Sequence, residues 1–187
     1  MVFIKWLALI LTALVLVSFG VYLMQPSMDE VGIPYERPYE SGVTVSDSAV
    51  TVKWFGVSTL LIDDGETQLL IDGYFSRPSL LDIALKRPIS SELETIAGVV
   101  DRFRMDRVAA VMPVHSHFDH AMDSAEVAKL TGALLLGSQS TANIGRSTQL
   151  PESQIGIVDV DKTYTFGQFK VTFYASEHAP LGSNSGI

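Results

Sequence analysis

The stretch Val108-Ala-Ala-Val-Met-Pro-Val-His-Ser-His-Phe-Asp-His120 decides both the fold and the site. Its first seven residues are almost wholly apolar, which predicts a strand covered on both faces. Three of the four histidines and one aspartate follow within six residues. In an extended segment residues i and i+2 point the same way, so His115 and His117 can reach one metal ion together. Asp119 and His120 begin the turn into the next helix, which suits a second ion nearby.

The fourth histidine, His178, follows another predicted strand, residues 169–175. Two strand ends that present imidazoles predict a cleft at one edge of a sheet. Surface histidines that meet by chance are the alternative, but a cluster of this density is typical of a metal site because imidazole is a common metal ligand. The sequence has no cysteine, so histidine and carboxylate side chains have to supply the ligands.

The pattern around the cluster predicts alternating strands and helices, and hence an α/β sandwich. Apolar runs at 58–62 and 68–71 flank the turn sequence Asp-Asp-Gly-Glu at 63–66, which predicts a hairpin after a first strand near residues 50–55. Residues 91–94 match a capping box, and apolar residues follow at helical spacing through Val100. Further helices are predicted at 123–130 and 140–150, and strands at 133–136, 155–160, 163–166 and 169–175.

The N-terminus predicts a different kind of segment. Residues 6–24 carry no charge and follow Lys5, which predicts a transmembrane helix within residues 1–25 that stays as a signal anchor. A cleaved export signal and a buried core helix are the alternatives. Residues 26–48, interrupted by prolines, form a linker, and residues 49–187 form the folded domain. With Lys5 on the cytoplasmic side, the domain is predicted outside the inner membrane, periplasmic or extracellular.

The run His115 to His120 matches the H-x-H-x-D-H motif, and in this it resembles the metallo-β-lactamase superfamily. Residues 54–73 are similar to the opening hairpins of that superfamily, which end in an aspartate near the metals, here Asp72. Residues 170–180 are similar to the strand and loop that supply a third histidine. The resemblance covers residues 50–180 and leans towards the lipase- and phosphodiesterase-like branch.

The resemblance implies a four-layer αβ/βα sandwich, of which the chain holds the first half and part of the second. It assigns His115, His117 and His178 to a first metal, and Asp119 and His120 to a second. The cofactor it implies is Zn²⁺, one or two ions, although iron and manganese accept the same ligands. Asp72 and Asp123 are candidates for carboxylates that orient the imidazoles. Alternatively, Asp72 only makes a turn and Asp123 only caps a helix.

The implied activity is hydrolysis. A water on zinc can have a pKa of about 7, and the resulting hydroxide, oriented by Asp119 as the catalytic residue, attacks an ester, lactone, amide or phosphodiester. The substrate is expected to be a small or lipid-like molecule. A net charge of −8 argues against nucleic acid as a partner and disfavours a nuclease of this fold. Because the superfamily's bridging carboxylate and last histidine have no counterpart here, a remnant that binds metal or a partner without catalysis is the alternative.

Overall fold

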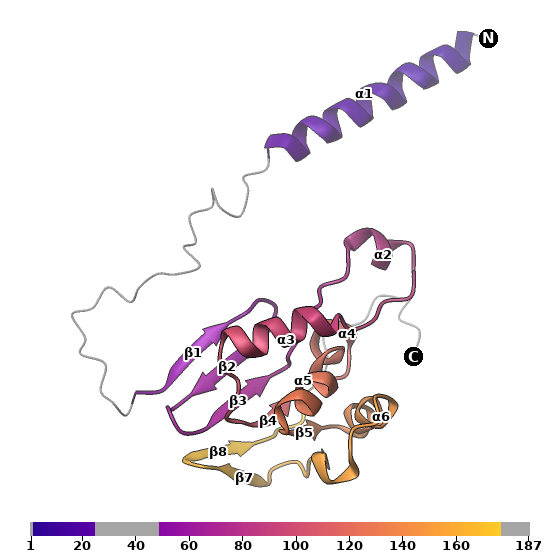
Figure 1. Ribbon diagram of the computed structural model, residues 1–187. Coiled ribbons are helices and arrows are strands. Elements are labelled where there is room, and N and C mark those ends of the chain that lie inside the picture. Colours follow the sequence, from indigo (N-terminus) through magenta and orange to yellow (C-terminus); the bar gives the residue numbers. More distant parts are fainter. Residues whose placement is uncertain (1, 25–48, 177–187) are drawn as a thin grey trace. The chain divides into compact units, whose positions relative to one another are not determined.

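The computed structural model describes residues 2–24 and 49–176, which belong to two separate units, Met1–Val45 and Ser46–Ile187 (Figure 1). The first unit contains α1 (Val2–Met24), so a helix is present where one was predicted. Among the residues whose side chains are described, no helix has the length and apolarity needed to cross a membrane, and the predicted transmembrane role of α1 is not supported. The predicted linker 26–48 lies outside the described residues.

The second unit is built on a six-stranded mixed sheet in the order β1-β2-β3-β4-β5-β6. The strands β1 (Thr51–Trp54), β2 (Leu60–Asp63) and β3 (Gln68–Ile71) are antiparallel neighbours, as the predicted hairpin requires. The strands β4 (Val108–Met112), β5 (Leu134–Gly137) and β6 (Ile155–Ile157) continue the sheet in parallel with β3. A parallel core strand with helical crossovers explains why β4 is apolar along its length.

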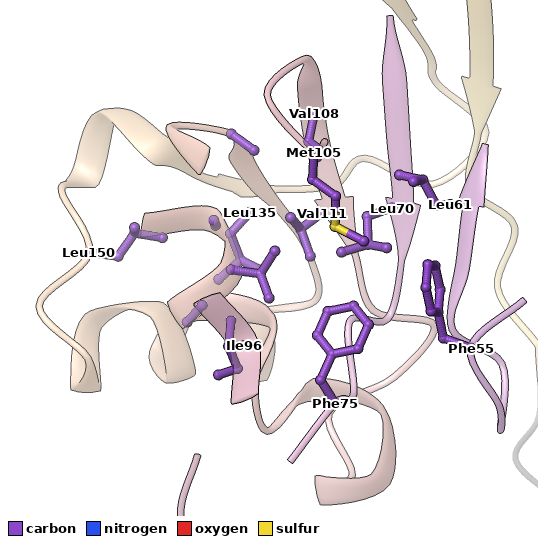
Figure 2. Packing of buried hydrophobic residues seen from close by; sticks show 14 residues of the cluster. Phe55, Leu61, Leu70, Phe75, Ile96, Met105, Val108, Val111, Leu135 and Leu150 are labelled. Carbon is purple, nitrogen blue, oxygen red and sulfur yellow. The ribbon is translucent and has the colours of Figure 1, made fainter. Parts of the chain in front are cut away.

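One face of the sheet carries the helices α3 (Leu93–Arg102), α5 (Ser124–Thr131) and α6 (Gln139–Ser147). Figure 2 shows how apolar side chains of the strands meet those of the helices on this face, among them Leu70, Val111 and Ile96. Helix α5 ends where the sequence predicts, because Gly132 takes the left-handed conformation (φ 76°) that closes a helix.

The predicted capping box at 91–94 is wrong. Helix α3 begins at Leu93 with Glu92 as its N-terminal cap, and no side chain caps it. The hydroxyl of Ser91 donates instead to the carbonyl oxygen of Met122 at 2.9 Å. A short helix that was not predicted from the sequence, α2 (Leu80–Ala84), precedes α3. Five residues are too few to display a helical period.

The other face of the sheet is covered in part by a separate hairpin of β7 (Thr163–Phe166) and β8 (Phe169–Thr172). The aromatic side chains of Phe166 and Phe169 pack against Leu69, Ala110 and Leu136 of the main sheet. The described part of the second unit is therefore a layer of helices, a six-stranded sheet and a two-stranded hairpin, in that order. A 3₁₀ turn at Glu152–Gln154 leads into β6.

Strand pairing fixes where the predicted site residues lie. Ile71 of β3 is in register with Met112 of β4, and the two strands run in parallel. Asp72 and the residues after Met112 therefore leave the sheet at the same edge. The backbone N–H of Asp72 still donates to the carbonyl oxygen of Met112, at 3.2 Å, which holds the two exits side by side.

Candidate metal centre

The histidine cluster lies directly beyond the carboxyl end of β4. A single helical turn, α4 (Phe118–Ala121), starts within it, and His117 is its N-terminal cap. The carbonyl oxygen of His117 accepts from the backbone N–H groups of His120 and Ala121, at 3.1 and 2.8 Å. This turn folds Asp119 and His120 back towards His115, whose ring centroid lies 4.1 Å from that of His120.

The first pair of donors is formed by His115 and His117. Nε2 of His115 lies 3.0 Å from Nδ1 of His117. Two nitrogen ligands at 2.0–2.1 Å from one tetrahedral zinc ion stand roughly 3.3 Å apart. The i, i+2 spacing thus brings the two imidazoles to the separation at which they can share one ion.

The second pair is formed by Asp119 and His120. Oδ2 of Asp119 lies 3.6 Å from Nε2 of His120, again the separation of two ligands on one ion. The described residues thus contain two donor pairs, and whether each pair holds an ion of its own stays a prediction.

Asp72 controls which nitrogen of His120 is available. It is fully buried, and its carboxylate accepts from Val114 N–H at 2.9 Å and contacts His120 Nδ1 at 2.8 Å. An ionised carboxylate only accepts hydrogen bonds, so this contact favours the neutral tautomer of His120 whose proton is on Nδ1. Nε2 then carries the lone pair that a metal needs. Asp72 has the contact that its predicted role requires.

Asp123 is placed differently from the prediction. It is fully buried, and its carboxylate accepts from the backbone N–H groups of Phe75 and Ser76, both at 2.7 Å, and from the Ser76 hydroxyl at 2.8 Å. It stands at the N-terminal cap of α5 without capping it through its side chain. Through these three hydrogen bonds Asp123 stabilises the loop at residues 75–76, which is not the role at the imidazoles that was predicted for it.

Two residues near the metal centre were not predicted from the sequence. The hydroxyl of Ser58 donates to Asp72 Oδ2 at 2.6 Å and lies 3.0 Å from His120 Nδ1. Tyr74 is buried, and its ring packs edge-on against Phe118 with the centroids 6.3 Å apart. Burial, and then the negative charges of Asp119 and Asp123, raise the pKa of the Tyr74 phenol, so it stays protonated at neutral pH. Neither residue belongs to a local sequence pattern, because the pairing of strands brings both to the metal centre from distant positions in the chain.

The described residues supply pairs of donors and not complete ligand sets. Among residues 49–176, no three histidine, aspartate or glutamate side chains gather closely enough to hold one ion. His178, the predicted third ligand of the first metal, lies outside the described residues. Metal binding by the five predicted ligands therefore stays a prediction.

Sequence relatives bear on the kind of protein to which this centre belongs. The chain is 24% identical over 120 residues to a "UPF0173 metal-dependent hydrolase" of Pyrobaculum islandicum, a match that covers 62% of this chain and 44% of the relative. A protein of the same description from Heliobacterium modesticaldum is 30% identical over 94 residues, covering 49% of this chain and 31% of the relative. This chain is a relative of these metal-dependent hydrolases. The family resemblance predicted from the motif is thereby confirmed.

The chain spans less than half the length of the metal-dependent hydrolases that it matches. No family model matches it. Among solved structures, the metallo-β-lactamase SMB-1 in complex with mercaptoacetic acid is similar at 19% identity and a TM-score of 0.47, covering 67% of this chain and 49% of that protein. The metallo hydrolase Igni18 of Ignicoccus hospitalis is similar at 17% identity and a TM-score of 0.43, covering 74% and 52%.

Proposed function

We propose that this chain provides the metal-binding part of a zinc-dependent hydrolase that cleaves an ester, lactone, amide or phosphodiester. The observation that carries the proposal is the pairing of donors, His115 with His117 and Asp119 with His120, beside a buried carboxylate that leaves Nε2 of His120 open. Nitrogen and oxygen donors without thiolate suit zinc, and iron or manganese accept the same set. The relatives' description as metal-dependent hydrolases supports the reaction class.

The proposed chemistry divides between the ion and the chain. When bound, zinc supplies an open coordination position and lowers the pKa of a water there to about 7. The half-buried carboxylate of Asp119 accepts a hydrogen bond from the attacking water and so orients it. Asp72 accepts from Nδ1–H of His120 and so favours the tautomer in which Nε2 is available to the ion.

The surroundings of the histidines support a small or lipid-like substrate. Val114 and Phe118 flank the cluster, and their side chains are 59% and 40% exposed. Exposed apolar side chains beside polar catalytic groups favour substrates that carry an acyl or other apolar group. In the same proposal the helix layer, sheet and hairpin are the first half and part of the second half of a four-layer αβ/βα sandwich. The location outside the inner membrane stays a prediction that cell fractionation tests.

The proposal is tested on the full chain, stripped with a chelator and reloaded separately with Zn²⁺, Mn²⁺ or Fe²⁺. Hydrolysis of a p-nitrophenyl acyl ester and of bis-p-nitrophenyl phosphate is then measured. At least one substrate should turn over with metal and not without, and the rate should vanish in His115→Ala. Ser140→Ala, on the exposed surface of α6, is the matched control and should keep the full rate.

The second candidate is the alternative already drawn from the sequence, a chain that binds a metal or a partner without catalysis. The same experiment separates the two candidates: metal uptake without turnover of either substrate supports the second.

A further inference from the structure

The turn between β1 and β2 has a conformation that its sequence does not favour. Gly56 and Val57 both have positive φ, 97° and 50°. A positive φ is a genuine outlier for a β-branched residue such as Val57, and such strain persists only where the surrounding structure enforces it. Here the Trp54 indole N–H donates to the carbonyl oxygen of Val57 at 3.0 Å. The backbone N–H of Thr59 donates to the carbonyl oxygen of Gly56, also at 3.0 Å.

The packing of the turn is equally specific. A Cβ atom added at Gly56 would lie 2.6 Å from a guanidinium nitrogen of Arg77, so the end of this flexible side chain lies directly against the turn. Beneath the turn, the buried hydroxyl oxygen of Thr59 accepts from the N–H of Tyr74 at 3.1 Å, which ties the turn to the segment that follows Asp72.

This turn fixes the position of Ser58. Its hydroxyl has one hydrogen, and the 2.6 Å contact gives that hydrogen to Oδ2 of Asp72. The oxygen lone pairs of Ser58 are then free to accept, and Nδ1 of His120 lies 3.0 Å away. The N–H of His120 thus points between two acceptors, Oδ2 at 2.8 Å and the Ser58 oxygen at 3.0 Å.

We propose that Ser58 is a positioning residue for His120, held by the strained 56–58 turn so that the imidazole keeps its Nδ1–H tautomer and presents Nε2 to a metal. With Asp72 alone, the ring is fixed by one contact and can tilt about it. With Ser58, the carboxylate oxygen and the ring are both held by a third group. The inference rests on the proposed function, since only a ligating ring needs this alignment.

The test compares four variants of the full chain: Ser58→Ala, Ser58→Thr, Ser58→Val and the control Ser91→Ala. Threonine and valine have nearly the same shape, but only threonine keeps the hydroxyl. Ser91 is a matched control because its hydroxyl also makes one partly buried hydrogen bond, to Met122, outside the metal centre. The first measurement is the ¹H–¹⁵N spectrum of the His120 ring in the metal-free chain at a fixed pH of about 8.5, where histidine is neutral.

Wild type, Ser58→Thr and Ser91→Ala should show the Nδ1–H tautomer of His120, while Ser58→Ala and Ser58→Val should show a mixture or exchange broadening. The second measurement is the affinity for Zn²⁺ alone by chelator competition, which should fall about 10-fold or more in the Ala and Val variants and stay near wild type in the Thr variant. If the Ala variant does not fold, the Thr and Val pair decides.

An unchanged ring spectrum in Ser58→Val, or Zn²⁺ affinity within twofold of wild type, overturns the role of Ser58. If the wild-type chain takes up no Zn²⁺, it is the proposed function that fails, and the ring spectrum then decides by itself whether Ser58 positions His120.

Discussion

At the scale of single residues, Asp72 links the sheet to the candidate metal centre. Its backbone is left-handed (φ 62°), a conformation that aspartate and asparagine tolerate better than most residues. Its carboxylate is fully buried but meets a backbone N–H, a hydroxyl and an imidazole. A buried charge with that many donors is stable only as long as each donor stays in place.

Asp72→Asn tests this link. Asparagine keeps the shape and the left-handed backbone, but its NH₂ group replaces one of the two oxygens. It then faces either the Val114 N–H on the Oδ1 side or Ser58 and His120 on the Oδ2 side, so at least one donor loses its acceptor. We expect the affinity for Zn²⁺ to fall by about 10- to 100-fold while the chain stays folded. Chelator competition measures the affinity, and circular dichroism checks the fold.

Asp64→Asn is the matched control, because the Asp64 carboxylate accepts only backbone N–H groups in the distant β2–β3 turn. Equal affinity in Asp72→Asn and wild type would show that Asp72 has no part in the metal centre.

The residues differ in how far sequence could predict them. His115, His117, Asp119 and His120 stand within one six-residue run, so local spacing alone groups them. Ser58 lies 62 residues before His120, and only the pairing of β2, β3 and β4 brings them together. Asp123 illustrates the opposite failure: its position after the motif suggested a role at the metals, but the N–H groups of residues 75–76 take its carboxylate.

At the scale of elements, α3 shows how packing overrides local signals. Its apolar positions predicted a helix correctly, since Ile96 faces the core and is 1% exposed. The capping box failed because the Ser91 hydroxyl found a carbonyl oxygen of another segment, which no local motif can reveal.

Two substitutions within α3 test this packing. Ile96→Ala should lower the free energy of unfolding by about 2–5 kcal/mol, because it leaves a cavity against the sheet. Leu93→Ala, at a position 60% exposed on the same helix, should change it by no more than about 0.5 kcal/mol. Urea unfolding of both variants provides the measurement, and similar losses would mean that Ile96 does not carry the helix–sheet contact.

A second element, the end of β2, gives a pH-dependent prediction. Burial raises the pKa of Asp63, but hydrogen bonds from Gln68, the Gly65 N–H and Arg107 outweigh it and hold the pKa below its ordinary value of 3.8. A carboxyl whose pKa is lower in the folded state stabilises the fold above its unfolded pKa. That contribution is lost as the pH falls from 3.8 through the lower folded pKa.

Asp63→Asn should therefore cost about 1 kcal/mol of unfolding free energy at pH 7 and progressively less as the pH falls below 4. Urea unfolding between pH 3 and pH 7 measures this difference. A cost that stays constant across this range would contradict an ionised Asp63 as its source.

At the scale of the whole molecule, alternating strands and helices predicted the α/β class, and parallel pairing of β3 to β6 explains why one edge of the sheet collects the site. The sequence did not indicate that the hairpin β7–β8 leaves the main sheet and packs on its second face. Both arrangements bury the same alternating residues, so periodicity cannot choose between them. For α1, an apolar composition predicted a membrane span that the described residues do not support.

The metal content of the chain tests most directly whether the two donor pairs hold metal. The full chain, loaded with Zn²⁺ and desalted, is analysed for zinc beside His115→Ala, Asp119→Asn and Phe118→Leu. Wild type and Phe118→Leu should retain zinc, because Phe118 has no ligating atom. His115→Ala should lose the first ion, whereas Asp119→Asn should keep it and lose hydrolytic activity by orders of magnitude. Wild-type chain without zinc after loading, or His115→Ala with as much zinc as wild type, would contradict the site.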